Sequence, residues 1–268
     1  AELNLSVVPL VVRFQGKEVS QYSEKWLKQM YAGMREGDVA TTSAVNPEGW
    51  TKVMEPVLQE GKDLLVFGFT SALSATYQSL VIAAEELREK YPQRKINIVD
   101  SLCAALGQGL LIWYACKKRD EGLSLEELYN WCEEHKFNIS HWFTVDDLFF
   151  LKRGGRLSGA TALIGSALGI KPVLHMDNEG HLINMFKVRG RKTSVTALAD
   201  KYTELADDKE NGVVFISHAD CMNDVKLLES MLKERYGASL DVITDVGTVI
   251  GAHAGPGTLA LFFVGKER

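Results

Sequence analysis

The sequence predicts an α/β protein of two domains: a mostly parallel, three-layer α/β domain at 1–137 and an α+β domain at 138–268. In the first half, buried strand segments alternate with helices of ten or more residues, a pattern typical of a parallel sheet covered on both faces. In the second half, hairpin-like strand pairs are mixed with helices. The length of 268 residues accommodates two hydrophobic cores.

The elements of the first half follow from local patterns. Residues 5–14 form a β-branched run that predicts a strand, in which Pro9 indicates a sheet edge. Asn46 before Pro47 has the form of a helix N-cap followed by a proline at the first helical position. The remaining segments predict strands at 63–69 and 96–100 and helices at 23–34, 50–60, 73–90, 106–118 and 124–136. Because residues 1–4 resemble the last turn of a helix, we expect a strand and a helix to precede them in the complete protein.

The second half is predicted to change pattern near residue 138. The turn at 178–180 separates two of its strands, and the glycine pair at 154–155 ends a helix. The expected strands are 141–145, 172–176, 183–188, 212–218, 240–245 and 259–264, and the expected helices are 146–153, 159–168, 193–205 and 224–236.

Composition excludes several classes of function. The net charge of −5 argues against nucleic acid as the main partner, because phosphate binding favours a basic face. The four cysteines form no C-x-x-C pair and have no histidine at metal-ligand spacing, so we expect reduced thiols, a cytoplasmic protein and no metal site. No apolar run approaches the length of a membrane-spanning helix.

The segment 70–77 contains four serine and threonine hydroxyls where a predicted strand turns into a helix. In a parallel α/β sheet this corner lies at the carboxyl end of the strand, where ligands usually bind. Hydroxyls and free helix N–H groups together suit an anion. A Ser/Thr cap with hydroxyls facing water is the alternative. Thr42 and Ser43 could bind a ligand oxygen or satisfy their own loop.

His253 is flanked by four glycines and a proline within residues 247–257. Such a composition indicates tight backbone turns that present the imidazole, and we interpret His253 as functional. Arg156 lies among three glycines, more than are needed to end a helix, so the backbone there could approach a ligand closely. The helix at 160–168 carries small side chains, which either allow close helix packing or line a channel filled by a hydrocarbon. The basic cluster at 187–192 is either solvated or docks a phosphate or an acidic surface.

In order and spacing, these motifs resemble the DegV family over nearly the whole chain: Thr42-Ser43, 70–77, 99–101, 154–159, 169–172, 187–192 and 251–257. The family consists of bacterial fatty-acid-binding proteins, several of which are lipid-carrying subunits of a fatty acid kinase. The resemblance implies two domains with one acyl chain in a tunnel between them. Two departures are Ala75, where the family usually has glycine, and the lack of a first strand ending in Asp-Ser.

The resemblance also implies residue roles. The fatty acid carboxyl group would be bound by Thr42, Ser74, Arg156 and His253. The supporting loops would contain Ser43, Thr70, Ser71, Gly155, Ser158 and Gly251. The acyl tunnel would be lined by Leu163, Ile164, Ala167, Leu168 and Ile170, and the kinase-facing surface would include Arg189 and Arg191.

We therefore expect a non-catalytic carrier that needs no cofactor. Its partners would be a long-chain fatty acid, the catalytic subunit of a fatty acid kinase and, for lipid exchange, transiently a membrane. The chain lacks a phosphate-binding G-x-x-x-x-G-K-[ST] loop, so ATP and metal would come from the partner. Two alternatives remain open: a carrier of another small anionic metabolite, and a hydrolase using Ser74 and His253, although no G-x-S-x-G elbow is present.

Overall fold

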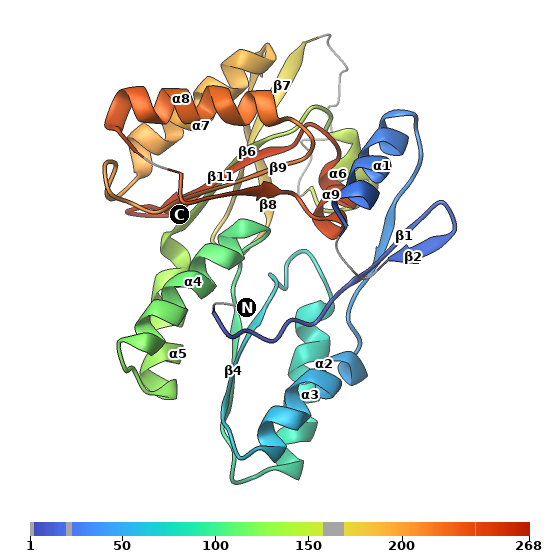
Figure 1. The fold of residues 1–268 in the computed structure, drawn as a ribbon, viewed down its shortest axis with the longest axis vertical. Helices are drawn as coiled ribbons and strands as arrows, with labels where there is room; N and C mark the ends of the chain where they lie inside the picture. The colour runs from blue at the N-terminus through green and yellow to red at the C-terminus, as the bar shows by residue number, and fades with distance from the viewer. Residues whose placement is uncertain (1–2, 20–22, 158–168, 239) are drawn as a thin grey trace.

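The chain folds into two parts stacked on one another, as seen in a computed structural model (Figure 1). The structure describes residues 3–19, 23–157, 169–238 and 240–268. The α/β class and the two-part architecture predicted from the sequence are confirmed. The predicted helix at 159–168 lies outside the described residues.

The C-terminal part is built on a six-stranded sheet with the order β10-β9-β11-β6-β7-β8. β11 lies in the middle and pairs antiparallel with both β9 and β6, whereas β10 and β9 are parallel. The strands of this sheet are β6 (Ile139–Thr144), β7 (Ile170–Met176), β8 (Leu182–Arg189), β9 (Val214–His218), β10 (Val242–Asp245) and β11 (Leu259–Val264).

Helices cover both faces of this sheet. α7 (Arg191–Leu205) and α8 (Met222–Tyr236) lie on one face, and α4 (Leu106–Asp120) contacts the other (Figure 1). Strand alternation explains the division, because successive side chains point to opposite faces. In β9, Ile216 packs against α7 and α8, while Phe215 belongs to the cluster that includes residues of α4.

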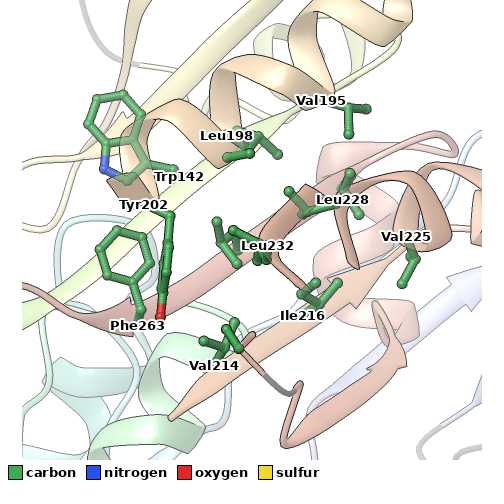
Figure 2. Packing of buried hydrophobic residues seen from close by; sticks show 14 of the residues in the cluster. Trp142, Val195, Leu198, Tyr202, Val214, Ile216, Val225, Leu228, Leu232 and Phe263 are labelled. Carbon is green, nitrogen blue, oxygen red and sulfur yellow. The ribbon is translucent and has the colours of Figure 1, made fainter. Parts of the chain in front are cut away.

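Figure 2 shows the core beneath α7 and α8. Tyr202 is completely buried and meets the ring of Phe263 edge to face, with 5.0 Å between the ring centroids. Leu228 and Leu232 of α8 are also completely buried. Burial of side chains of this size stabilises the fold by about 1.5–3 kcal/mol each.

The N-terminal part contains the parallel pair β4 (Leu64–Gly68) and β5 (Ile96–Asp100), which confirms the predicted β-α-β unit. Its helices are α2 (Pro47–Gln59), α3 (Thr76–Lys90) and α5 (Leu125–His135), followed by the short η1 (Lys136–Asn138). The predicted caps form: Asn46 accepts from Gly49 N–H, and Ser124 and Glu127 make a capping box.

Three short strands form a separate antiparallel sheet that the sequence did not predict. β1 (Val11–Phe14) pairs with β2 (Lys17–Val19) on one side and β3 (Thr41–Ser43) on the other. The predicted strand 5–14 is wrong for residues 5–10, which form no ladder. The segment 41–43, interpreted as a loop, is a strand because β1 supplies its hydrogen-bonding partners.

The two halves of the sequence are interleaved in space. α1 (Glu24–Arg35) packs through Tyr31 against the C-terminal part, where its hydroxyl donates to Val246 O at 2.5 Å. The predicted boundary at residue 137 falls within η1, immediately before β6. Because α1 packs against the C-terminal part, this residue divides the chain in sequence but not in space. The domain boundary therefore remains a proposal.

Candidate functional site

A cavity of about 820 Å³ extends from the end of β3 across the N-terminal part to the inner face of the six-stranded sheet. Its wall is mostly apolar and is formed by both halves of the sequence. Representative lining residues are Leu10, Trp50, Phe67, Ile112, Phe143 and Ile250. This volume falls within the range of about 300–1,000 Å³ typical of small-molecule sites.

Thr42 and His253 meet at this cavity from opposite halves of the chain. Thr42 Oγ1 lies 2.8 Å from His253 Nε2, and both residues line the cavity. Thr42 is held by its pairing with Val12 in the β1–β3 ladder. The predicted turn around His253 is wrong: this residue lies in α9 (Thr248–Ala254).

Glycines allow α9 to pack closely rather than bend sharply. A Cβ atom at Gly251 would overlap the Tyr31 hydroxyl, so this glycine lets α1 approach α9. Gly255 ends the helix with a φ of +81°, a conformation that glycine adopts readily. A Cβ atom at Gly154 would lie 2.5 Å from His253 Nδ1, so this glycine leaves room for the imidazole. Gly251 therefore acts behind the site and does not line the cavity.

The imidazole of His253 is neutral at pH 7. Its pKa is lowered to about 4, first by burial and then by the positive charges of Arg156 and Arg153. A neutral imidazole can donate one hydrogen bond and accept another. A bound anion would offset the two arginine charges that disfavour the imidazolium.

Ser74 lies at the predicted strand–helix corner, just before α3. Its hydroxyl donates to Thr76 Oγ1 at 2.9 Å and accepts from Thr76 N–H at 3.2 Å. Thr76 Oγ1 in turn accepts from Val45 N–H at 3.3 Å, so the corner is joined to the loop between β3 and α2. Ser74 and Thr76 both line the same cavity as Thr42.

Arg156 also lines the cavity and links the two parts of the chain. Its Nε donates to Leu73 O at 3.1 Å, and its Nη1 donates to Gly154 O. The guanidinium therefore fastens the residue next to Ser74 to the loop that follows α6 (Phe149–Arg153). The four residues predicted to bind a carboxyl group thus all reach one cavity, and their roles toward a ligand are a proposal.

Those predicted supporting residues that the structure describes lie behind or beside the cavity, not in its lining. Thr70 is fully buried and donates to Gly180 O at 3.1 Å, so it joins the two parts of the protein. Ser71 is exposed, and its N–H donates to the Asp100 carboxylate. Ser43 pairs with Val11 in the ladder.

Gly155, another predicted supporting residue, adopts a φ of +67° at the end of α6 and serves as a helix terminator. Ile170 begins β7 opposite Arg189 and does not line the cavity, because the ladder holds it on the hairpin. Ser158 and the predicted tunnel residues Leu163, Ile164, Ala167 and Leu168 lie outside the described residues.

The two arginines predicted to face a kinase differ in their surroundings. Arg189 is exposed at the end of β8. Arg191 is not a surface group: its Nε pairs with Asp224 at 3.0 Å and its Nη2 donates to Gly257 O at 2.6 Å. These contacts tie the start of α7 to α8 and to the turn between α9 and β11, so Arg191 has a structural role, and the kinase-facing role expected of it stays a prediction.

Several polar residues that line the cavity were not predicted from the sequence, among them His141, Ser217 and Thr258. His141 is buried in β6, where its ring lies 2.8 Å from Ile139 O and 3.3 Å from Ala104 N. Burial is the main cause that lowers the pKa of His141 well below its usual value. No local motif marks any of these residues. Strand alternation places His141 of β6 and Ser217 of β9 on the inner face, and Thr258 lies just before β11.

The geometry does not favour a Ser/His hydrolase. Ser74 bonds to Thr76, and the described partner of His253 is Thr42. Across the described ranges, no group of three or more His, Cys, Asp or Glu side chains could hold a metal ion. The four cysteines are free thiols. None of the helices in the described part of the chain is long and apolar enough to cross a membrane.

Comparison with known proteins gives consistent matches along the chain. Residues 1–266 match the family described as "Uncharacterised protein, DegV family". A DegV domain-containing protein of Clostridium perfringens is 44% identical over 246 residues, which are 92% of this chain and 84% of that protein.

Solved structures agree with the fold. A DegV family protein from Thermus thermophilus, described by its fatty acid binding, is 30% identical with a TM-score of 0.87 and covers 98% of this chain and 93% of its own. The Streptococcus pneumoniae fatty acid kinase B3 protein, loaded with linoleic acid, is 22% identical with a TM-score of 0.83, covering 96% of this chain and 90% of its own. The second likeness is one of fold alone.

Proposed function

This chain belongs to the DegV family, and from that premise we propose that it binds one long-chain fatty acid in its cavity, with the carboxyl group beside Thr42 and His253. The observation that carries this proposal is a largely apolar cavity in which polar groups from both halves of the sequence converge. The fatty acid binding described for the Thermus thermophilus relative supports it.

The energetics favour a lipid tail over a small polar metabolite. Each buried methylene contributes about 0.8 kcal/mol, so a sixteen-carbon chain offers on the order of 12 kcal/mol before the costs of association. Hydroxyl groups of Thr42 and Ser74, together with the imidazole of His253, can donate to the carboxylate. The tail supplies affinity, and the polar residues orient the head group.

We further propose that the bound carboxyl group is presented to the catalytic subunit of a fatty acid kinase. A carboxylate oxygen would attack the γ-phosphorus of ATP held by that kinase, the bond to ADP would break, and ADP would leave. This chain would act as the non-catalytic, lipid-carrying subunit, and Arg189 would face the kinase. Transient contact with a membrane would serve lipid exchange.

The first experiment identifies the ligand. The purified protein is denatured and extracted with organic solvent, and the extract is analysed by mass spectrometry. Stoichiometric long-chain fatty acid supports the proposal. An empty protein that also fails to take up added fatty acid, or one that turns over esters, refutes it.

A variant tests where the head group lies. Thr42→Val keeps the side-chain shape and removes the hydroxyl, so we expect fatty acid affinity to fall about tenfold, the value of one hydrogen bond to a charged group. The control is Thr196→Val, because Thr196 is partly buried on α7, lies outside the cavity lining, and its hydroxyl bonds within its own helix. Equal affinities of the two variants would place the carboxyl group elsewhere.

The kinase role requires a separate assay. His253→Ala should retain fatty acid yet slow phosphorylation by the partner kinase, because the imidazole would stabilise charge on the transferred group. Unchanged phosphorylation in this variant would remove that role from His253. Retention of lipid in the same sample distinguishes this result from a failure of fatty acid binding.

A further inference from the structure

Ser217 is a polar residue in an apolar stretch of the cavity wall. It lies in β9, paired with Ala260 of β11 and Thr244 of β10, and only 1% of its surface is exposed. Strand alternation directs it to the same face as Phe215, toward the cavity that it lines.

The Ser217 hydroxyl has no hydrogen-bond partner among the described residues. Other buried serines differ: the hydroxyls of Ser79, Ser101 and Ser194 each donate to a backbone carbonyl. An unsatisfied buried hydroxyl is costly, and such groups are rare in folded proteins. The missing partner of Ser217 is therefore expected inside the cavity.

The surroundings of Ser217 do not supply that partner. The nearby cavity wall contains Val246, Val249 and Ile250, which are apolar. Thr258 also lines the cavity, but its hydroxyl already donates within the chain, at 3.1 Å to Ala254 O and 2.8 Å to Gly255 O.

Ser217 lies toward the same end of the cavity as His253. Val249 and Ile250 precede His253 by about one turn of α9 and share a face with it. At the start of this helix, Val246 N–H donates to the carbonyl of His218, the residue next to Ser217. Cys116 of α4 and Leu128 of α5 also line the cavity, and these helices lie away from α9 (Figure 1).

We propose that Ser217 is a second polar anchor, which recognises a hydroxyl group on the carboxyl-proximal half of the acyl chain. This inference rests on the proposed fatty acid binding and extends the ligand class to hydroxy fatty acids. A hydroxyl group both donates and accepts, so it satisfies Ser217 and is itself satisfied within an apolar wall. When the bound acyl chain carries no hydroxyl group at this point, only a water molecule can form a hydrogen bond with the Ser217 hydroxyl.

The test compares ligands that differ only in the position of one hydroxyl group. Affinities are measured by calorimetry for hexadecanoic acid and for its 3-hydroxy, 7-hydroxy and 16-hydroxy derivatives. We expect one proximal isomer to bind about tenfold more tightly than the 16-hydroxy isomer, as one well-formed buried hydrogen bond allows. Ser217→Ala should abolish that preference, so that the proximal isomer and the 16-hydroxy isomer bind to the variant with equal affinity.

The control variant is Ser194→Ala, which removes a buried hydroxyl at the start of α7, outside the cavity lining. It should retain the preference for the proximal isomer. Ser217→Thr keeps a hydroxyl and should retain part of that preference, which guards against a misfolded alanine variant.

Equal affinity of wild-type protein for all three hydroxy isomers, or the same preference in Ser217→Ala, would overturn the inference while leaving fatty acid binding intact. Failure to bind hexadecanoic acid at all would refute the proposed function, and the inference with it.

Discussion

Binding of a fatty acid carboxylate beside His253 should depend on pH. In the ligand-free protein the pKa of His253 is about 4, so the imidazole is neutral near pH 7. A carboxylate at Thr42 would add a negative charge within hydrogen-bonding reach, and an opposite charge at that range raises a histidine pKa by about 1–3 units. The complex therefore holds a proton over a pH range in which the free protein does not.

The sign and size of the effect follow from linkage. Because the pKa of His253 is higher in the complex, lowering the pH favours the complex and tightens binding. If the carboxylate raises this pKa by two units, from about 4 to about 6, affinity increases about fourfold between pH 7.5 and pH 5.5. At the lower pH, binding takes up about three-quarters of a proton per ligand.

The assay is calorimetric titration with hexadecanoic acid at both pH values, in two buffers of different ionisation enthalpy. The difference in observed heat between the buffers counts the protons taken up. His253→Gln keeps a polar side chain that does not titrate, so its fatty acid affinity should lose the part of the pH dependence that His253 contributes. An unchanged pH dependence in His253→Gln, or no proton uptake by the wild-type protein at pH 5.5, would refute the placement of the carboxylate.

Three predictions concern stability and are checked by chemical denaturation. Gly180→Ala should lower the free energy of unfolding by about 2 kcal/mol, because φ is +83° and the new Cβ would overlap Thr70. The control Gly122→Ala, where φ is +99° and the surrounding space is open, should lower it by only about 1 kcal/mol. Equal losses in the two variants would show that the overlap with Thr70 has no effect. Arg268→Met should cost about 3 kcal/mol, since buried Arg268 donates to the carbonyls of Leu102 and Lys136; a loss below 1 kcal/mol would contradict that estimate. The pKa of His253 is lower in the folded than in the unfolded protein, so the neutral imidazole contributes stability that is present above pH 6.5 and is lost as the pH falls toward 4. His253→Gln should make this loss of stability with falling pH less steep. An equally steep loss in the variant would exclude His253 as its source.

The parts of the fold that sequence predicted well are governed by local chemistry. Buried strands followed by helices located β4, β5 and the corner at Ser74. The pattern of glycines pointed to His253, and the family resemblance added Thr42 and Arg156; all three reach the cavity. Caps at Asn46 and Ser124 formed as predicted, because an N-cap depends only on residues within one turn.

The errors arose where distant contacts decide. Thr42 lies in a strand only because Val12, thirty residues earlier in the chain, pairs with it. The glycines around His253 suggested turns, but Gly251 serves the approach of Tyr31 to a helix. Ser217 carries no motif at all, and its position in the wall depends on the neighbours of β9 in a six-stranded sheet.

The head-group site has a further energetic consequence. Thr42 and His253 already satisfy one another at 2.8 Å in this structure. A carboxylate that bonds to either of them must replace that hydrogen bond or share it, so part of the gain is offset by about 1 kcal/mol. The head group therefore adds less affinity than its hydrogen bonds alone would give, whereas each methylene of the tail adds about 0.8 kcal/mol. Selection among fatty acids should consequently depend on the cavity wall, where Ser217 is the one described lining residue whose side-chain hydroxyl is both buried and unsatisfied.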